Sequence, residues 1–321
     1  MTVTVRSFAK INLGLYIGAV RADGFHELRT VYQTIALRDV IRVSVGRGSG
    51  IEISCTNKDP RVPLDSSNTC YRVAERVLDQ LGVTSKVSIE IEKRLPVQGG
   101  MGAASSNAVA TMIGLELALK KKLSPEARLR IAADVGSDLP LFLVGGTVLG
   151  VGRGEEVYPV TDLPALPMVV VTPEVGVSTP EAFADWDRLT RPQSSDRLFE
   201  VGCALSAWLS GLGSPNTGAS AKGGSRAEKL LLDLVRTGIE NDFEKVVFPK
   251  YPELRDIKGA LERAGSSYAS LSGSGSTLYG LFRSSGDAAK AAGRLRKQGL
   301  KAVATSTLTR SRYWKQLVVK H

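Results

Sequence analysis

Apolar and polar positions alternate in short runs along roughly the first 95 residues, interrupted by one helical segment. The runs carry β-branched residues or strict alternation, which predicts β-strands. Residues 68–82 instead gather apolar side chains on one helical face and end at Gly82, which predicts a helix. The predicted strands cover residues 3–5, 11–17, 41–45 and 87–91, and the last of them leads directly into a glycine-rich loop.

Helical and strand-like patterns continue along the rest of the chain. Ser105 begins an apolar run that predicts a helix to about Lys122, and Ser124-Pro125-Glu126 predicts the start of a helix that ends near Gly136. Residues 168–171 predict a short buried strand. The remaining predictions are a mainly helical region over 197–264 with a mobile loop at 213–224, strand–loop–strand over 268–282, and an Ala/Lys/Arg-rich helix and a final strand that close the chain.

These elements favour an α+β fold with two lobes. The first half of the chain is rich in strands, the middle is rich in helices, and the end is βαβ-like. The shift in composition places a boundary near residue 160, so the expected domains are residues 1–160 and 161–321. No internal repeat of fixed period is visible in the sequence.

The composition limits the class of protein. With 43% hydrophobic and 23% charged residues, the chain resembles ordinary soluble globular proteins. No apolar run reaches the roughly 18 residues that a membrane span needs, and residues 1–6 lack the apolar core of a signal peptide. We therefore expect a cytoplasmic protein that does not bind membranes, as a monomer or a weak homodimer.

Cysteine and histidine are too few and too scattered for several kinds of site. Cys55, Cys70 and Cys203 are widely spaced and have no clustered histidines beside them, so a zinc site or a disulfide framework is not expected. The two histidines are His26 and the C-terminal His321. A catalytic triad based on histidine and a multi-histidine metal site are both excluded.

A formal net charge of +10 favours an anionic partner. Nucleic acid is one such partner, but the basic residues are dispersed and aromatic residues make up only 6% of the chain. No basic block alternates with aromatic residues, as it does on surfaces that bind single strands. A small substrate rich in phosphate would use the same field, and we expect no nucleic acid partner.

The glycine-rich loop spans residues 98–107, Gln-Gly-Gly-Met-Gly-Ala-Ala-Ser-Ser-Asn, between a strand and a helix start. Small residues let backbone N–H groups approach a polyanion, and a helix N-terminus adds a positive dipole end. Ser105 and Ser106 supply hydroxyls for phosphate oxygens or hydrated Mg²⁺. The loop lacks the lysine of a Walker A motif and the spacing of a dinucleotide fold. Taken alone, a strand-to-helix turn capped by Ser or Asn explains it equally well.

Three further features carry candidate chemistry. Lys10 lies inside an apolar strand, where it is either an outward-facing residue or a buried and paired one. Asp138 lies in a polar turn before Pro140 and is either a capping residue or a functional carboxylate. Residues 272–276, Ser-Gly-Ser-Gly-Ser, form either a plain glycine-rich hairpin or a second loop that supports a ligand.

Taken together, these segments resemble the GHMP kinases, a superfamily of small-molecule kinases. The stretch Ala9-Lys10-Ile11-Asn12-Leu13 and the stretch from Arg21 to His26 are similar to the members that act on a cytidine diphosphate conjugate of methylerythritol. The resemblance covers residues 6–185 and resumes over 240–282. It implies a two-lobed fold with an N-terminal ATP-binding lobe of mixed sheet and helices and a C-terminal α/β substrate lobe.

The resemblance also implies ATP and Mg²⁺ as cofactors, a small-molecule alcohol as substrate, and roles for individual residues. Lys10 and Asp138 take the catalytic positions, while no metal ligand is assigned. The ATP loop falls on Gly99, Gly100, Met101, Gly102, Ala103, Ala104, Ser105, Ser106 and Asn107. Substrate binding falls on Asn12 at the erythritol end, on Phe25, His26, Thr179 and Phe183 around cytidine, and on Gly273, Ser274 and Gly275 beside the phosphates.

The chain departs from the family pattern in two ways. Ala103 and Ala104 stand where glycine is usual. The exchange costs nothing in helical geometry, but about 1 kcal/mol of strain if either residue is left-handed, and ATP affinity would register it. Phe25 stands where tyrosine is commoner, which preserves stacking but removes a hydroxyl.

Three other functions stay open on the sequence alone. Another GHMP kinase, of the homoserine or mevalonate type, would share the loop and the Lys10–Asp138 pair but would have no use for Phe25 and His26. The two alanines of the loop also suit a catalytically idle nucleotide-binding module. The net charge suits nucleic-acid binding, which sequence-selective retention on DNA would support.

Overall fold

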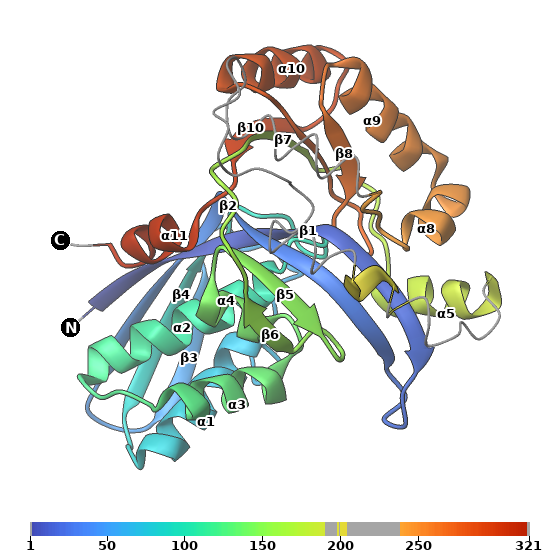
Figure 1. Cartoon of the computed structure of the whole chain (residues 1–321). Helices are drawn as coiled ribbons and strands as arrows, with labels where there is room; N and C mark the ends of the chain where they lie inside the picture. Colours follow the sequence, from blue (N-terminus) through green and yellow to red (C-terminus); the bar gives the residue numbers. More distant parts are fainter. Residues whose placement is uncertain (1, 190–197, 199, 204–237, 320–321) are drawn as a thin grey trace, which may run out of the picture.

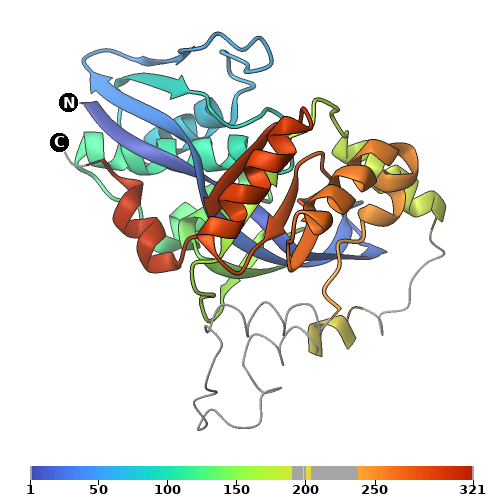
Figure 2. The ribbon, with the colours of Figure 1, turned by 90° about the horizontal axis from the view of Figure 1, so that it is seen from above.

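The alternating runs at the start of the chain form two long antiparallel strands. The computed structural model describes residues 2–189, 198, 200–203 and 238–319. β1 (Thr2–Val20) pairs with β2 (His26–Gly46) along nearly its whole length. In both Figure 1 and Figure 2, this blue ribbon runs from the side of α1–α3 to the side of α5 and α8.

The other strands of the first sheet attach to this pair. β4 (Lys86–Glu92) pairs with residues 40–46 of β2, and β5 (Thr147–Val151) pairs with residues 30–33. β3 (Gly50–Cys55) runs parallel to β4, while β6 (Glu156–Pro159) is antiparallel to β5. The expected mixed sheet of the N-terminal lobe is therefore confirmed.

Four helices accompany the first sheet, and their ends follow local sequence signals. Asn68 accepts a hydrogen bond from the Cys70 backbone N–H at the start of α1, and Gly82 is left-handed at its end. Ser124 caps α3 in the same way, with Pro125 in its first turn. α2 is buried nearly all round, as expected for a helix that packs on two sides. The helices are α1 (Thr69–Leu81), α2 (Ala103–Leu119), α3 (Pro125–Val135) and α4 (Leu139–Val144).

The second sheet has four antiparallel strands in the order β10-β7-β9-β8. The unit β9–α10–β10 is the expected βαβ-like end, with β7 lying between the two strands. Its strands are β7 (Pro167–Val171), β8 (Tyr268–Leu271), β9 (Leu278–Leu281) and β10 (Ala302–Ser306). Its helices are α5 (Thr179–Leu189), α8 (Glu244–Lys250), α9 (Pro252–Arg263) and α10 (Ser285–Lys297). The loop predicted at 213–224 lies outside the described residues.

One apolar cluster contains residues from both sheets, with β1 and β2 on one side and β7 and β9 on the other. Ile11 and Leu13 of β1 are fully buried there against Val170 of β7 and Tyr279 of β9. Met101 and Ala103 of the glycine-rich loop belong to the same cluster. The loop is therefore packed into the junction of the two sheets.

The predicted Ala/Lys/Arg-rich helix and final strand are present as α10 and β10, but the prediction that this strand closes the chain was wrong. After β10 the chain forms α11 (Arg310–Leu317), which returns to the first sheet. Tyr313 is buried, its hydroxyl donates a 2.6 Å hydrogen bond to the Phe142 carbonyl, and its ring packs on Phe8. Among the described residues, no helix is both long and apolar enough to cross a membrane.

Replacing Tyr313 tests whether α11 belongs to the core of the first sheet. Tyr313→Ala should lower the free energy of unfolding in urea by about 3–5 kcal/mol, because a buried aromatic ring leaves a cavity. Lys315→Ala, on the exposed face of the same helix, is the matched control. A loss below about 1 kcal/mol for Tyr313→Ala would show that α11 is only loosely attached.

Candidate active site

Two cavities meet at the glycine-rich loop. The first, which we call the loop cavity, has a volume of about 340 Å³ and is lined by residues 98–105, Asn107 and the segment around Asn68. The second, the lysine cavity, has a volume of about 700 Å³ and contains Lys10 and Asp138. Gly100, Gly102 and Ser105 line both cavities, so a ligand extending from one into the other must pass this loop.

Lys10 is buried and paired, which rules out the outward-facing alternative. Its Nζ lies 2.7 Å from Asn12 Oδ1 and 3.3 Å from Asp138 Oδ2, with 4% of the side chain exposed. It also lies 5.4 Å from the centre of the Tyr32 ring. A buried ammonium needs such partners, because removal from water is costly for an isolated charge.

The backbone around Lys10 explains how β1 brings this side chain into the cavity. The register between β1 and β2 shifts between Phe8 and Lys10 and again between Asn12 and Gly14. Irregularities of this kind redirect side chains and are frequent beside active sites. The Lys10 backbone N–H also donates a 3.0 Å hydrogen bond to the Met101 carbonyl, which fixes the strand against the glycine-rich loop.

Glycines from both glycine-rich segments cover the Lys10 side chain. A Cβ atom at Gly102 would lie 3.1 Å from Lys10 Cγ, and one at Gly273 would lie 3.6 Å from Lys10 Nζ. Both glycines have positive φ, 65° and 58°. Lys10 is therefore the point where β1, the glycine-rich loop and the 272–276 segment converge.

Asp138 stands at the N-cap position of α4, but its side chain makes no capping hydrogen bond. The carboxylate instead faces Lys10 through Oδ2 and accepts a 3.2 Å hydrogen bond from the Tyr32 hydroxyl through Oδ1. Burial, and secondarily the nearby Asp138 charge, raise the pKa of Tyr32 well above its usual value, so its hydroxyl stays a donor. The capping alternative for Asp138 is not supported.

Tyr32 was not predicted from the sequence. It reaches the site because it lies opposite Asn12 in the β1–β2 register, and register shifts cannot be read from the pattern of apolar residues alone.

The glycine-rich loop keeps glycine at two positions with left-handed backbone, Gly100 at φ 72° and Gly102 at φ 65°. A Cβ atom at Gly100 would collide with the Ser272 carbonyl oxygen, so this loop and the 272–276 segment are in direct contact. Ala103 and Ala104 lie inside α2 with helical backbone, and neither has a positive φ. The strain considered for these alanines is therefore absent.

The start of α2 remains available to a ligand. Its N-cap is Gly102, and no side chain caps this end. The first-turn N–H groups of a helix have no acceptor within the helix, so they attract an anion. Ser105 lies in this first turn and lines both cavities, whereas Ser106 is buried and accepts a 2.7 Å hydrogen bond from the Ser7 hydroxyl. The structure thus places Ser106 outside both cavities.

Asp39 ties the two ends of the loop together. It is fully buried in β2, and its Oδ1 accepts hydrogen bonds from the Arg94 and Leu95 backbone N–H groups, both at 2.7 Å. Its Oδ2 accepts from Lys93 Nζ at 2.6 Å and from Asn107 Nδ2 at 3.0 Å. The Asn107 side chain therefore holds the loop by binding Asp39. Asp39 was not predicted from the sequence.

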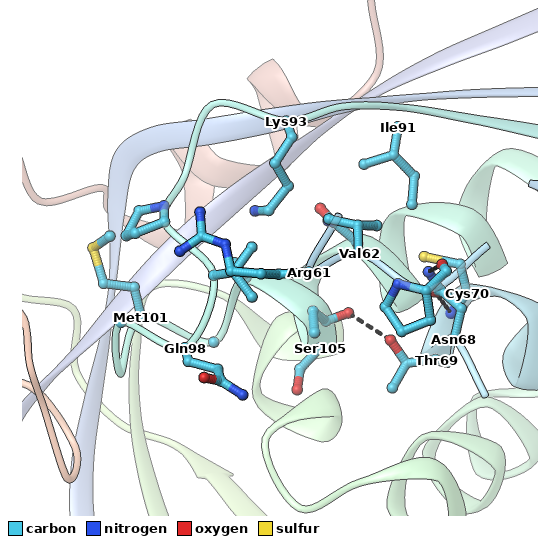
Figure 3. A pocket seen from close by; sticks show the side chains of 18 of the residues that line it. Arg61, Val62, Asn68, Thr69, Cys70, Ile91, Lys93, Gln98, Met101 and Ser105 are labelled. Carbon is cyan, nitrogen blue, oxygen red and sulfur yellow. Dashed lines mark hydrogen bonds between the residues drawn. The ribbon is translucent and has the colours of Figure 1, made fainter. Parts of the chain in front are cut away.

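The loop cavity has one wall with two ion-paired basic side chains and a second, less polar wall. In Figure 3, Arg61 and Lys93 lie on one side of it, and Asn68 and Cys70 lie on the other. Asp59 accepts two hydrogen bonds from the Arg61 guanidinium, which lowers the pKa of Asp59 to about 2. The wall therefore stays an ion pair at neutral pH.

His26 lies at the outer end of the lysine cavity. Its ring stacks on Phe183 of α5, with centroids 5.1 Å apart and planes 9° apart. Nδ1 lies 2.9 Å from the Gly18 carbonyl oxygen, and Nε2 lies 3.1 Å from Asp187 Oδ1. Both partners are acceptors, and Asp187 was not predicted from the sequence.

Phe25 precedes His26 and is 52% exposed at the mouth of the same cavity. Arg153, a further residue absent from the predictions, places its guanidinium carbon 4.9 Å from the centre of the Phe25 ring. An exposed aromatic ring beside a stacked imidazole is a surface that suits a flat, planar ligand.

The 272–276 segment reaches the lysine cavity through Gly273 and Ser274. The Ser274 hydroxyl lies 2.7 Å from the Thr179 hydroxyl at the start of α5. Asn241 Nδ2 donates to the Gly273 carbonyl at 2.8 Å and holds the segment in place. Gly275 instead faces Leu271 and does not line the cavity.

The predicted site residues therefore converge, apart from Ser106 and Gly275. Asn12 lines the lysine cavity but is only 1% exposed, and the two ends of its amide contact Lys10 and Thr30. Within the described part of the chain, no group of three or more His, Cys, Asp or Glu residues could hold a metal ion.

Comparisons with known proteins agree with this geometry. Family models of the GHMP kinases match residues 68–146 for the N-terminal domain and residues 226–301 for the C-terminal domain. A 4-diphosphocytidyl-2-C-methyl-D-erythritol kinase from Solibacter usitatus is 37% identical over 284 residues, or 87% of this chain and 81% of the relative. An enzyme of the same name from Prosthecochloris aestuarii is 37% identical over 92% of this chain and 94% of the relative.

Solved structures show the same similarity. A crystal structure of a 4-(cytidine 5'-diphospho)-2C-methyl-D-erythritol kinase matches with a TM-score of 0.71 and 29% identity, covering 95% of this chain and 98% of the other. A homoserine kinase from Cytophaga hutchinsonii matches with a TM-score of 0.73 at 20% identity, covering 96% and 95%, which shows the shared fold alone. The chain belongs to the 4-diphosphocytidyl-2-C-methyl-D-erythritol kinase family of the GHMP kinases.

Proposed function

We propose that this chain transfers the γ-phosphoryl group of ATP to the 2-hydroxyl of 4-diphosphocytidyl-2-C-methyl-D-erythritol, a step of non-mevalonate isoprenoid precursor synthesis. The names of its relatives support the substrate. The observation that carries the chemistry is the Lys10–Asp138 pair, 3.3 Å apart, beside the loop where the two cavities meet.

ATP would occupy the loop cavity, with its phosphates directed to the start of α2. The left-handed glycines at positions 100 and 102 let the backbone approach the β- and γ-phosphates, and the uncapped helix end supplies N–H donors. The less polar wall around Cys70 suits the adenine ring, and the ion-paired Arg61 and Lys93 supply N–H donors on the opposite wall. The γ-phosphate would then lie where Ser105 opens into the lysine cavity.

Asp138 and Lys10 would act on the reacting groups. Asp138 accepts the proton of the attacking hydroxyl while a new P–O bond forms and the bond from Pγ to the β-phosphate oxygen breaks, releasing ADP. Lys10 pairs with the carboxylate and stabilises the charge that develops on the transferred group. Tyr32 orients the carboxylate through its hydrogen bond to Oδ1.

The residues at the meeting point of the cavities suit Mg²⁺. This ion keeps several waters and binds through substrate phosphates and one or two protein oxygens. The Ser105 hydroxyl, which lines both cavities, is the oxygen group that we assign to it. When bound, Mg²⁺ would neutralise charge on the transferred group.

The cytidine end of the substrate would bind at the outer part of the lysine cavity. His26 stacked on Phe183, together with the exposed Phe25 ring, supplies aromatic surface on which a base can stack. Thr179, Gly273 and Ser274 lie between this end and Lys10, beside the expected diphosphate. Substrates of homoserine or mevalonate kinases have no base for such a surface to bind.

The alternative of a catalytically idle nucleotide-binding module is not supported, because it rested on Ala103 and Ala104 and neither residue is strained.

We keep the domain boundary near residue 160 as a proposal. The helix α11 lies after this boundary in the sequence but packs on the first sheet. A cytoplasmic location, as a monomer or weak homodimer without nucleic acid or membrane partners, is proposed from composition.

Removing either member of the catalytic pair should stop the reaction. Lys10→Ala and Asp138→Asn should each lower turnover of the cytidine diphosphate substrate by about 100-fold or more, because both act in the transition state. Steady-state ADP release measures this, with circular dichroism as a check of the fold. Lys121→Ala and Asp79→Asn, at exposed positions, are the matched controls. Near-normal turnover in both site variants would refute the proposed mechanism.

His26→Ala should separate the two substrates. Loss of the stacked imidazole should raise the KM for the cytidine diphosphate substrate at least about 10-fold and leave the KM for ATP nearly unchanged, since His26 does not line the loop cavity. Equal changes in both KM values would remove His26 from the cytidine site.

Gly100→Ala should impair ATP binding. The added methyl group would meet the Ser272 carbonyl and force an unfavourable backbone, so the loop must shift. We expect the KM for ATP to rise about 10-fold or more. Gly293→Ala in α10, where a Cβ atom meets nothing within 4 Å, is the control. An unchanged KM for ATP in Gly100→Ala would place the nucleotide elsewhere.

A further inference from the structure

We infer that Thr30 is a positioning residue that sets the orientation of the Asn12 amide and, through it, the place of the Lys10 ammonium. The inference rests on the proposed function, in which Lys10 and Asp138 act on the transferred phosphoryl group. Thr30 lies in β2, is 1% exposed and does not line the lysine cavity. Its effect on the reaction must therefore pass through other residues.

The hydroxyl of Thr30 has one hydrogen, and that hydrogen has a definite acceptor. Thr30 Oγ1 donates a 2.8 Å hydrogen bond to the Gly14 carbonyl oxygen. It can therefore only accept from its other neighbour, the Asn12 side chain. The Asn12 group that faces it, Nδ2 at 2.7 Å, is the donor that this arrangement requires.

Because Nδ2 faces Thr30, the oxygen Oδ1 of the Asn12 amide must face Lys10. Asn12 Oδ1 accepts a 2.7 Å hydrogen bond from Lys10 Nζ, a group that has donors and no acceptor. A flipped amide would turn NH₂ toward the ammonium and a carbonyl oxygen toward a hydroxyl oxygen whose hydrogen is already used. Both new contacts would be repulsive, so Thr30 and Lys10 together permit one orientation.

The shorter of the two polar contacts of the Lys10 ammonium is the one with Asn12. The Lys10–Asn12 distance of 2.7 Å is shorter than the 3.3 Å between Lys10 and Asp138. The contact of Asn12 with the erythritol end of the substrate stays a prediction. In the structure, Asn12 lines the lysine cavity, and its amide contacts Lys10 at one end and Thr30 at the other.

Hydrogen bonds from side chains also hold the β1 backbone at Asn12, Leu13 and Gly14. The register shift between Asn12 and Gly14 leaves three successive carbonyls to accept hydrogen bonds from side-chain hydroxyls. The donors come from both sheets: Tyr279 to Asn12 at 2.8 Å, Tyr268 to Leu13 at 2.9 Å, and Thr30 to Gly14 at 2.8 Å. Thr30 is the member of this set that also contacts the amide.

Thr30→Val tests the inference, because valine has nearly the same shape but no hydroxyl. We expect kcat for the cytidine diphosphate substrate to fall about 10- to 100-fold, as for a misplaced catalytic group, with both KM values within about 3-fold of the parent. Thr30→Ser, which restores the hydroxyl, should recover most of the loss. Thr4→Val, at the far end of β1, is the matched control.

A double-variant cycle distinguishes positioning from a general structural effect. If Thr30 acts through Asn12, Thr30→Val should lower kcat little further in an Asn12→Ala background. Additive losses, a rise in substrate KM without a fall in kcat, or parent-like turnover of Thr30→Val would each overturn the inference. Should Thr30→Val fail to fold, as judged by its melting temperature, Thr30→Ala, which also lacks a hydroxyl, carries the same test.

Lys10→Ala, assayed in parallel, distinguishes failure of the proposed function from failure of the role proposed for Thr30. Full activity of Lys10→Ala would refute the proposed function, whatever Thr30 does. An inactive Lys10→Ala beside a fully active Thr30→Val would refute only the role of Thr30.

Discussion

Burial of the Lys10 ammonium is the constraint on which the rest of the site depends. A cation removed from water requires partners, and here they come from segments far apart in the sequence: Asn12 in β1, Tyr32 in β2 and Asp138 before α4. Gly102 and Gly273 leave just enough room for the side chain. The Lys10 ammonium thus contacts Asp138, the candidate base, and lies against both glycine-rich segments.

The same arrangement ties the site to the core. β1 carries Lys10, and its neighbours Ile11 and Leu13 are buried in the cluster that joins the two sheets. Asp39 has the corresponding role for the loop cavity, because one buried carboxylate binds both the backbone that follows β4 and Asn107 in the second turn of α2. The loop that would receive phosphate is therefore held in place before any ligand arrives, which limits the entropy lost on binding.

Local signals made much of the fold predictable. Asn68 with Gly82, and Ser124 with Pro125, mark helix ends that the structure reproduces. Lys10 and Asp138 were identified through family resemblance, and the structure brings them together. Tyr32, Thr30 and Asp39 were missed because their places depend on strand register and on contacts between distant segments. The short helix α11 was missed because its main partners, Phe8 and Phe142, lie far away in the sequence.

The most direct test of the account is the substrate preference of the purified chain. ADP release with ATP and Mg²⁺ would be measured for a panel of alcohols: 4-diphosphocytidyl-2-C-methyl-D-erythritol, homoserine and mevalonate. The account predicts turnover of the cytidine diphosphate conjugate, with the other two alcohols at background. Efficient phosphorylation of homoserine or mevalonate, or no ADP release with any member of the panel, would contradict it.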